Sequence, residues 1–134
     1  MILGIESQNH QYNCWASCID ISQNDTPNFD RNYVERFEFK DEILEKYEDV
    51  TDTPSQYKFG HTVIRFAETE WNIRHGSYSV TTHGATYLGT SQNGTQYTWS
   101  KNGRGKAPGV FTVGQLNQKY GKVEGYRAEP GGGF

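Results

Sequence analysis

Cys14 lies in a segment that carries the residue types needed for thiol chemistry. Gln8 stands six residues before it, and Trp15 follows it directly and opens a short apolar run. A catalytic thiol needs a stabilised thiolate, which a helix N-terminus favours, and an amide donor that holds the developing oxyanion. Cys14 is therefore a candidate nucleophile and Gln8 a candidate oxyanion donor. The alternative is that Cys14 is a small buried apolar residue, as most free cysteines are.

A thiol nucleophile needs a base, and the chain offers four histidines: His10, His61, His75 and His83. His83 precedes an alternating β-rich run that reaches an Asn-Gly turn, and the returning strand ends just before Asn102. A residue at the start of one strand lies near a residue at the end of its hairpin partner. We therefore expect Asn102 to orient the imidazole of His83 toward Cys14. His10, four residues from Cys14, is the alternative base.

The residues around Cys14 show helical spacing. Apolar side chains between residues 13 and 21 recur on one face, and Asn13 is a good N-cap. This places Cys14 in the first turn, where the helix dipole favours a thiolate. Cys18 follows one turn later, and we expect it to pack on the buried side, with both cysteines reduced.

The remaining segments change from helical to β patterns along the chain. Residues 33–50 combine apolar positions with many charges and predict an amphipathic helix. Residues 61–73 fit either a strand or a helix, and the helix is favoured. From about residue 77 the pattern is β: a hairpin over residues 81–100, then a strand end with a short helix over residues 110–120, then a last strand over residues 121–127.

Length and composition limit the classes of protein that fit. A chain of 134 residues predicts one domain, here residues 1–128, followed by a flexible tail over residues 129–134. The formal net charge of −3 without a basic block argues against nucleic-acid binding. The sequence has neither an apolar run long enough to cross a membrane nor a recognisable signal peptide. Cysteine and histidine spacing matches no zinc site, so we expect no metal and no cofactor.

Taken in order, these residues resemble a papain-like cysteine peptidase. The resemblance is carried by Gln8 before the Cys14–Trp15 pair, by His83 opening a strand, and by Asn102 after the next strand. It implies Gln8 as the oxyanion residue, Cys14 as the nucleophile, His83 as the base and Asn102 as the orienting amide. The stretch from residue 83 to residue 126 further resembles the compact papain-fold toxin domains at the ends of bacterial polymorphic toxins.

This resemblance implies an α+β papain-like fold, in which an N-terminal catalytic helix packs against an antiparallel β-sheet from the C-terminal half. It implies cleavage of a target protein by a toxin or effector domain, delivered as such or as part of a larger secreted chain, and a cognate immunity protein. Glutamine deamidation, transglutamination or cell-wall amide cleavage would use the same residues. The alternative of another class is a non-catalytic module that binds a protein or a glycan.

Overall fold

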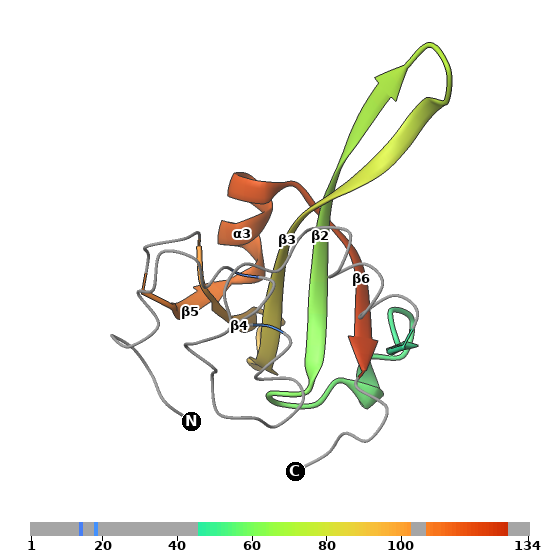
Figure 1. Ribbon diagram of the computed structural model, residues 1–134. Coiled ribbons are helices and arrows are strands. Elements are labelled where there is room, and N and C mark those ends of the chain that lie inside the picture. The colour runs from blue at the N-terminus through green and yellow to red at the C-terminus, as the bar shows by residue number, and fades with distance from the viewer. Residues whose placement is uncertain (1–13, 15–17, 19–45, 103–106, 129–134) are drawn as a thin grey trace.

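The computed structural model describes residues 14, 18, 46–102 and 107–128. Within this part of the chain, strands hold 54% of the residues and form one six-stranded antiparallel sheet. The strand order is β1-β6-β2-β3-β4-β5 (Figure 1). The elements are β1 (Glu48–Asp49), the 3-10 helix η2 (Pro54–Gln56), β2 (Thr62–Asn72), β3 (Gly76–Thr90), β4 (Gln96–Ser100), β5 (Gly109–Thr112), α3 (Val113–Tyr120) and β6 (Lys122–Ala128).

Strands β2 and β3 form the centre of the sheet and then leave it together. The inner part of β2, residues 62–67, pairs with β6 on one side and with β3 on the other, and it is buried throughout. Beyond Ala67, β2 pairs with β3 alone over residues 68–72 and 76–80. This outer part together with the turn between its strands, residues 68–80, is called the arm, and it projects from the body of the molecule (Figure 1). Its residues are exposed or half-buried.

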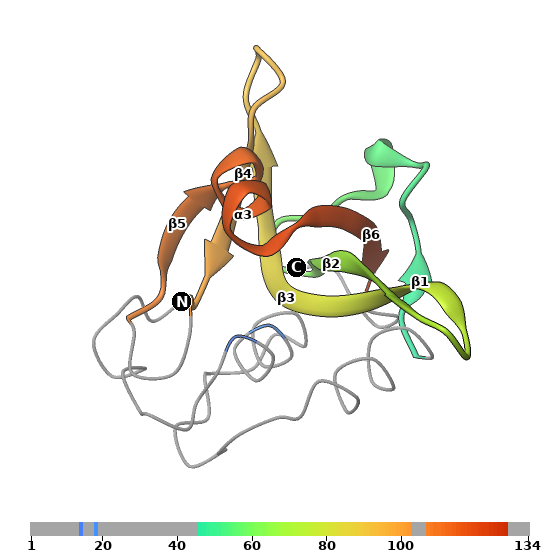
Figure 2. The ribbon, with the colours of Figure 1, turned by 90° about the horizontal axis from the view of Figure 1, so that it is seen from above.

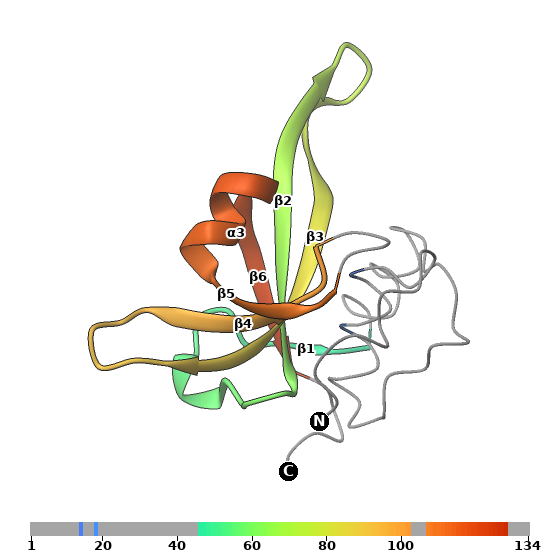
Figure 3. The same ribbon diagram turned by 90° about the vertical axis from the view of Figure 1, so that its left-hand side faces the viewer.

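Helix α3 covers one face of the sheet and closes the main apolar core. Thr112 and Gln115 form a capping box, in which the Gln115 N–H donates to Thr112 Oγ1 at 3.1 Å and the Thr112 N–H donates to Gln115 Oε1 at 2.8 Å. Leu116 then packs with buried residues of β2, β3 and β6. Figures 2 and 3 show α3 on one side of β2 and β3.

The end of α3 is fixed by a glycine. Gly121 has a φ of 108°, which L side chains rarely adopt, and a Cβ added there would lie 2.5 Å from the Ala67 carbonyl oxygen. The chain therefore passes from α3 to β6 in direct contact with β2. This contact determines where Tyr120, the last residue of α3, can lie.

The predicted fold class is wrong. The described residues form mainly an antiparallel sheet. The α-helix that is described over its whole length, α3, lies in the C-terminal half of the chain. An α+β papain-like arrangement centred on an N-terminal catalytic helix is therefore not what this part of the chain shows. The resemblance rested on short motifs around single residues, and such motifs do not determine which elements build the core. The proposed tail over residues 129–134 lies outside the described residues.

The predictions for individual helices and strands are partly wrong and partly confirmed. The helix favoured for residues 61–73 is wrong, because this segment is strand β2, and the predicted helix over residues 33–50 is wrong at its end, where β1 pairs with β6. The Asn-Gly hairpin is confirmed as β3, the Gly94 turn and β4, and the short C-terminal helix and last strand are confirmed as α3 and β6. Within the described residues, no helix is long and apolar enough to cross a bilayer.

Candidate active site

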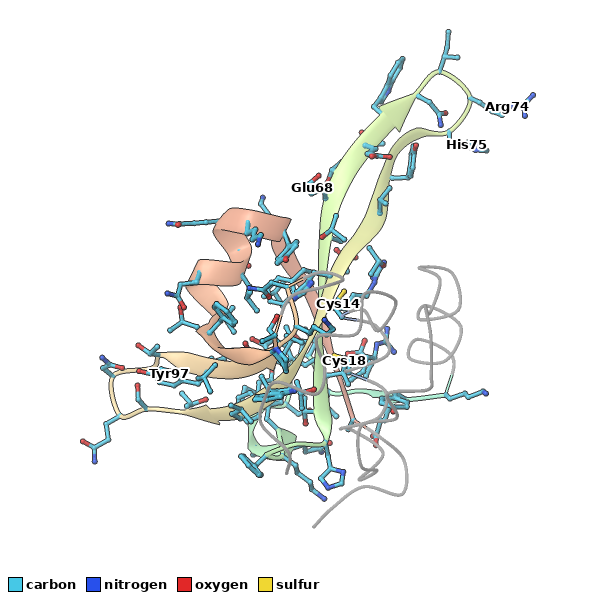
Figure 4. All side chains as sticks on the ribbon, turned by 60° about the vertical axis from the view of Figure 1, so that its left-hand side comes forward. Cys14, Cys18, Glu68, Arg74, His75 and Tyr97 are labelled. Carbon is cyan, nitrogen blue, oxygen red and sulfur yellow. The ribbon has the colours of Figure 1, made fainter. Side chains whose placement is uncertain are left out.

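Cys14 and Cys18 lie one helical turn apart, and both are buried free thiols (Figure 4). The hydroxyl of Thr86 on β3 lies 3.8 Å from the Cys18 sulfur and donates to it. Burial raises the pKa of the Cys18 thiol, and a charge on Cys14 would raise it further. Cys18 therefore remains protonated and packs on the buried side as the sequence predicted.

A charge on Cys14 affects the pKa of two side chains, Lys101 directly after β4 and Tyr120 at the end of α3. Burial lowers the pKa of Lys101, which is only 1% exposed, and a Cys14 thiolate opposes that shift. Burial also raises the pKa of Tyr120 to about 12, and the Cys14 thiolate adds to that shift. A charge–charge interaction acts equally on both partners, so the ammonium of Lys101 stabilises the thiolate of Cys14.

His83 is held in a buried chain of hydrogen bonds. Its Nε2 lies 2.7 Å from Ser100 Oγ on β4, and that hydroxyl donates to Asn102 Oδ1 at 2.5 Å. His83 and Ser100 are each 1% exposed. Asn102 therefore does reach the imidazole, but through an intervening serine and not by the direct bond that the sequence predicted.

The plane of the His83 ring is fixed by aromatic neighbours. Tyr120 stacks on it with ring centroids 3.8 Å apart and an interplanar angle of 4°. Phe66 on β2 lies on another side, with centroids 5.9 Å apart. Tyr120 is itself restrained, because Thr82 Oγ1 donates to its carbonyl oxygen at 2.5 Å. Thr82 is the extra residue of a bulge in the β2–β3 ladder, next to His83.

The electrostatic surroundings of His83 keep it neutral. Burial lowers the pKa of the imidazole to about 3, and the positive charge of Lys119 on α3 adds to this shift. Lys119 Nζ itself lies 5.3 Å from the Tyr120 ring centroid. A neutral imidazole has one nitrogen with a free lone pair, which is the state a general base needs. Its protonation would be favoured only where a nearby anion compensates the new charge.

The structure brings several of the predicted site residues into one region. Cys14 interacts with Lys101, which lies between Ser100 and Asn102 in sequence, and with Tyr120, which stacks on His83. His83 differs from expectation in one respect: it lies inside β3 and not at its start, because the strand begins at Gly76 in the arm. Gln8 lies outside the described residues.

The rival bases have different positions. His75 lies in the turn at the tip of the arm, well away from Cys14 (Figure 4). His61 is buried immediately before β2. His10 lies outside the described residues.

Sequence reasoning missed Ser100 and Tyr120. Ser100 could have been found from its position, because residues two apart in an extended segment point to the same side, and Asn102 was already a candidate. Tyr120 had no comparable signal. Its contact with His83 depends on how α3 crosses the sheet, which no local pattern reveals.

No protein-family model, curated protein or solved structure matches this chain. Among the described residues, no group of three or more histidine, cysteine or acidic side chains is placed to hold a metal ion. The geometry around Cys14 and His83 therefore carries what can be inferred about function.

Proposed function

We propose that this protein is a thiol-dependent acyl transferase of the cysteine peptidase type, which cleaves a peptide or isopeptide bond in a target protein. The proposal rests on a buried, neutral imidazole, hydrogen-bonded through Ser100 to Asn102, that lies in the same region as Cys14. An apolar core would not require a histidine with this pattern of restraint. The proposal depends on these residues and does not depend on a papain-like fold.

In the first half of the reaction, His83 accepts the Cys14 thiol proton, and the thiolate attacks the carbonyl carbon of the substrate. A carbon–sulfur bond forms while the carbonyl π bond becomes an oxyanion. The Cys14 backbone N–H and the Gln8 side chain are the proposed donors to that oxyanion. The imidazolium then gives its proton to the departing amine as the carbon–nitrogen bond breaks.

In the second half, water resolves the thioester. His83 removes a proton from the water, whose oxygen attacks the acyl carbon, and the proton returns to the sulfur as the carbon–sulfur bond breaks. Lys101 and Tyr120 contribute to this cycle through charge and packing. The ammonium of Lys101 stabilises the thiolate, and Tyr120 shields one face of the imidazole from water.

The product identifies the reaction subtype. Hydrolysis of a peptide bond gives a new N-terminus, deamidation converts glutamine to glutamate with release of ammonia, and transglutamination gives a cross-link. The protein would be incubated with a mixed proteome and with a peptidoglycan preparation, and the products mapped by mass spectrometry. We expect new N-termini that Cys14→Ala abolishes and Cys18→Ala retains.

Alkylation gives a test that needs no substrate. Iodoacetamide at pH 6 should label Cys14 well ahead of Cys18, because Lys101 favours the Cys14 thiolate while burial keeps Cys18 protonated. Equal slow labelling of the two thiols, or products that persist in Cys14→Ala, would overturn the proposal.

A second candidate function is protein binding without catalysis, and one observation favours it. The arm exposes large apolar side chains, namely Trp71 at 67%, Ile73 at 91% and Tyr78 at 38%. Large exposed apolar side chains can mark interaction sites, and in this register Trp71, which pairs with Ser77, and Tyr78, which pairs with Glu70, lie on opposite faces of the arm. The discriminating result is a partner captured equally well by the wild type and Cys14→Ala, and lost by Trp71→Ser, with no modified product from any variant.

A further inference from the structure

The hydroxyl of Ser100 has only one proton, and the structure indicates where it goes. Ser100 Oγ donates to Asn102 Oδ1, which is a carbonyl oxygen and can only accept. The same Oγ lies 2.7 Å from His83 Nε2. Since the serine proton is already used, the bond to His83 can exist only if Nε2 carries a proton and donates it to Ser100.

This proton count determines the tautomer of His83. A neutral imidazole carries a single proton, so with Nε2 protonated the lone pair lies on Nδ1. Burial and Lys119 keep the ring neutral over the physiological range. Nδ1 is then the nitrogen that can accept a proton from a thiol.

The stacking contacts cannot supply this restraint. Tyr120 and Phe66 fix the plane of the ring, but an aromatic face contacts either tautomer equally well and permits a 180° flip of the imidazole about its Cβ–Cγ bond. A directional hydrogen bond to one nitrogen is needed to remove both freedoms. Within the described residues, Ser100 is the hydrogen-bond partner of Nε2.

We propose that Ser100 is a positioning residue for His83: it accepts from Nε2–H, passes the restraint to Asn102, and so holds the imidazole in the tautomer whose basic nitrogen is Nδ1. This inference deepens the proposed function, and its catalytic consequence rests on that function. Asn102 acts on the imidazole through its hydrogen bond with Ser100. Its role is to fix the direction of the serine hydroxyl.

The proposal predicts a specific ranking of variants. Ser100→Ala removes the acceptor for Nε2–H, so the other tautomer becomes accessible and the ring gains freedom. Ser100→Thr keeps a hydroxyl at the same position and should restore the wild-type tautomer. Asn102→Ala keeps the serine but frees its proton, so it should perturb His83 less than Ser100→Ala does.

The tautomer can be measured without any substrate. Isotope-labelled histidine gives nitrogen NMR signals whose shifts distinguish a protonated from an unprotonated Nε2, and the four histidines are assigned by single His→Gln variants. We expect the wild type and Ser100→Thr to show a protonated Nε2 at His83, and Ser100→Ala to show a mixture. Thr98→Val is the matched control, because Thr98 is a buried hydroxyl of the same strand that bonds Phe111 and not His83.

The catalytic consequence is measured on the same variants. The rate of Cys14 alkylation against pH, and any turnover found, should fall by roughly 10- to 100-fold in Ser100→Ala, a size typical of lost partners behind a functional histidine. Ser100→Thr should recover most of that loss, and Thr98→Val should lose none of it. A merely structural serine would change the unfolding midpoint without changing the tautomer.

The outcomes separate the two proposals. A wild-type His83 protonated on Nδ1, or a Ser100→Ala spectrum identical to wild type, overturns the positioning role and leaves Cys14 chemistry intact. A correct tautomer together with unreactive Cys14, or products unaffected by Cys14→Ala, overturns the proposed function and leaves the hydrogen-bond chain intact. If Ser100→Ala does not fold, the comparison of Ser100→Thr, Asn102→Ala and wild type still decides the question.

Discussion

The inner and outer parts of the β2–β3 ladder belong to one pair of strands, with the bulge at Thr82 between them, and they differ in burial and in their neighbours. Residues 62–67 are flanked by β6 as well as β3, and they are buried, as is His83 opposite Phe66. Residues 68–72 and 76–80 pair only with each other and are largely exposed. The inner part restrains a histidine with aromatic rings and hydrogen bonds, whereas the turn of the arm carries His75 in the open. Backbone pairing alone therefore does not make a site: flanking strands and α3 do.

The largest expected effect comes from removing one histidine from each of these two regions in turn. His83→Ala should lower the rate of acyl transfer by about 100- to 10,000-fold, the usual contribution of a general base. His75→Ala should leave that rate unchanged, because its ring lies at the tip of the arm, away from Cys14. The measurement is turnover, or Cys14 alkylation at pH 6 if no substrate has been found. Comparable losses of rate in both variants would show that the inner and outer parts of the ladder do not differ in their contribution to catalysis.

Two glycines test the same comparison through stability. At Gly121 a methyl group would meet the Ala67 carbonyl oxygen at 2.5 Å, in a backbone conformation with a φ of 108°. Gly121→Ala should therefore lower the free energy of unfolding by at least about 2 kcal/mol, because backbone strain and overpacking add. At Gly76 in the arm the φ is 69° and nothing lies within 4 Å, so Gly76→Ala should cost only about 1–2 kcal/mol.

Urea unfolding of both variants checks this ranking. Gly121→Ala should also slow Cys14 chemistry, since it displaces the neighbouring Tyr120 from the His83 ring. A Gly76→Ala variant less stable than Gly121→Ala would show that the arm contributes more to folding than its exposure suggests.

The buried imidazole also predicts how stability depends on pH. Burial lowers the pKa of His83 from 6.5 to about 3. Between these values the unfolded chain binds a proton that the folded chain does not, so stability is complete above pH 6.5 and falls as the pH drops toward 3. One such group gives a slope of at most about 1.4 kcal/mol per pH unit.

His83→Gln should flatten this slope, which urea unfolding at several pH values between 7 and 4 would measure. Asp49 contributes at lower pH, because hydrogen bonds from Thr51 hold the pKa of its carboxyl below 3.8. A slope that persists in His83→Gln would mean that another group titrates in this window.

The sequence was most informative where local chemistry determines structure. The Asn-Gly turn predicted the β3–β4 hairpin, because its backbone conformation suits few other residues. The same hairpin correctly brought His83 and Asn102 to one region, since strand pairing follows from the turn. The roles of these residues and of Cys14 remain predictions.

Local patterns failed where packing from distant segments decides the outcome. Residues 62–67 lie between β3 and β6 in the sheet and are buried throughout, so their apolar residues do not alternate and their spacing resembles that of a helix. In the arm the apolar pattern was misleading for a different reason, because Trp71 and Ile73 are apolar and yet exposed. Tyr120 meets His83 only because α3 connects β5 to β6 across the sheet. Contacts of this kind join residues far apart in sequence and leave no periodic signal.

The smallest expected effect belongs to the arm itself. Trp71→Ser and Ile73→Ser remove side chains that are 67% and 91% exposed, so little packing is lost. Each should change the free energy of unfolding by less than about 0.5 kcal/mol, as surface substitutions usually do. Turnover of a short peptide should not change either, because the arm contributes no residue to the hydrogen-bond chain around His83. Urea unfolding and peptide turnover measure both quantities, with His83→Ala as the positive control. If turnover of a whole protein falls while that of a peptide does not, the arm contacts the substrate beyond the scissile bond, and the exposed apolar side chains of the arm and the buried site serve one function.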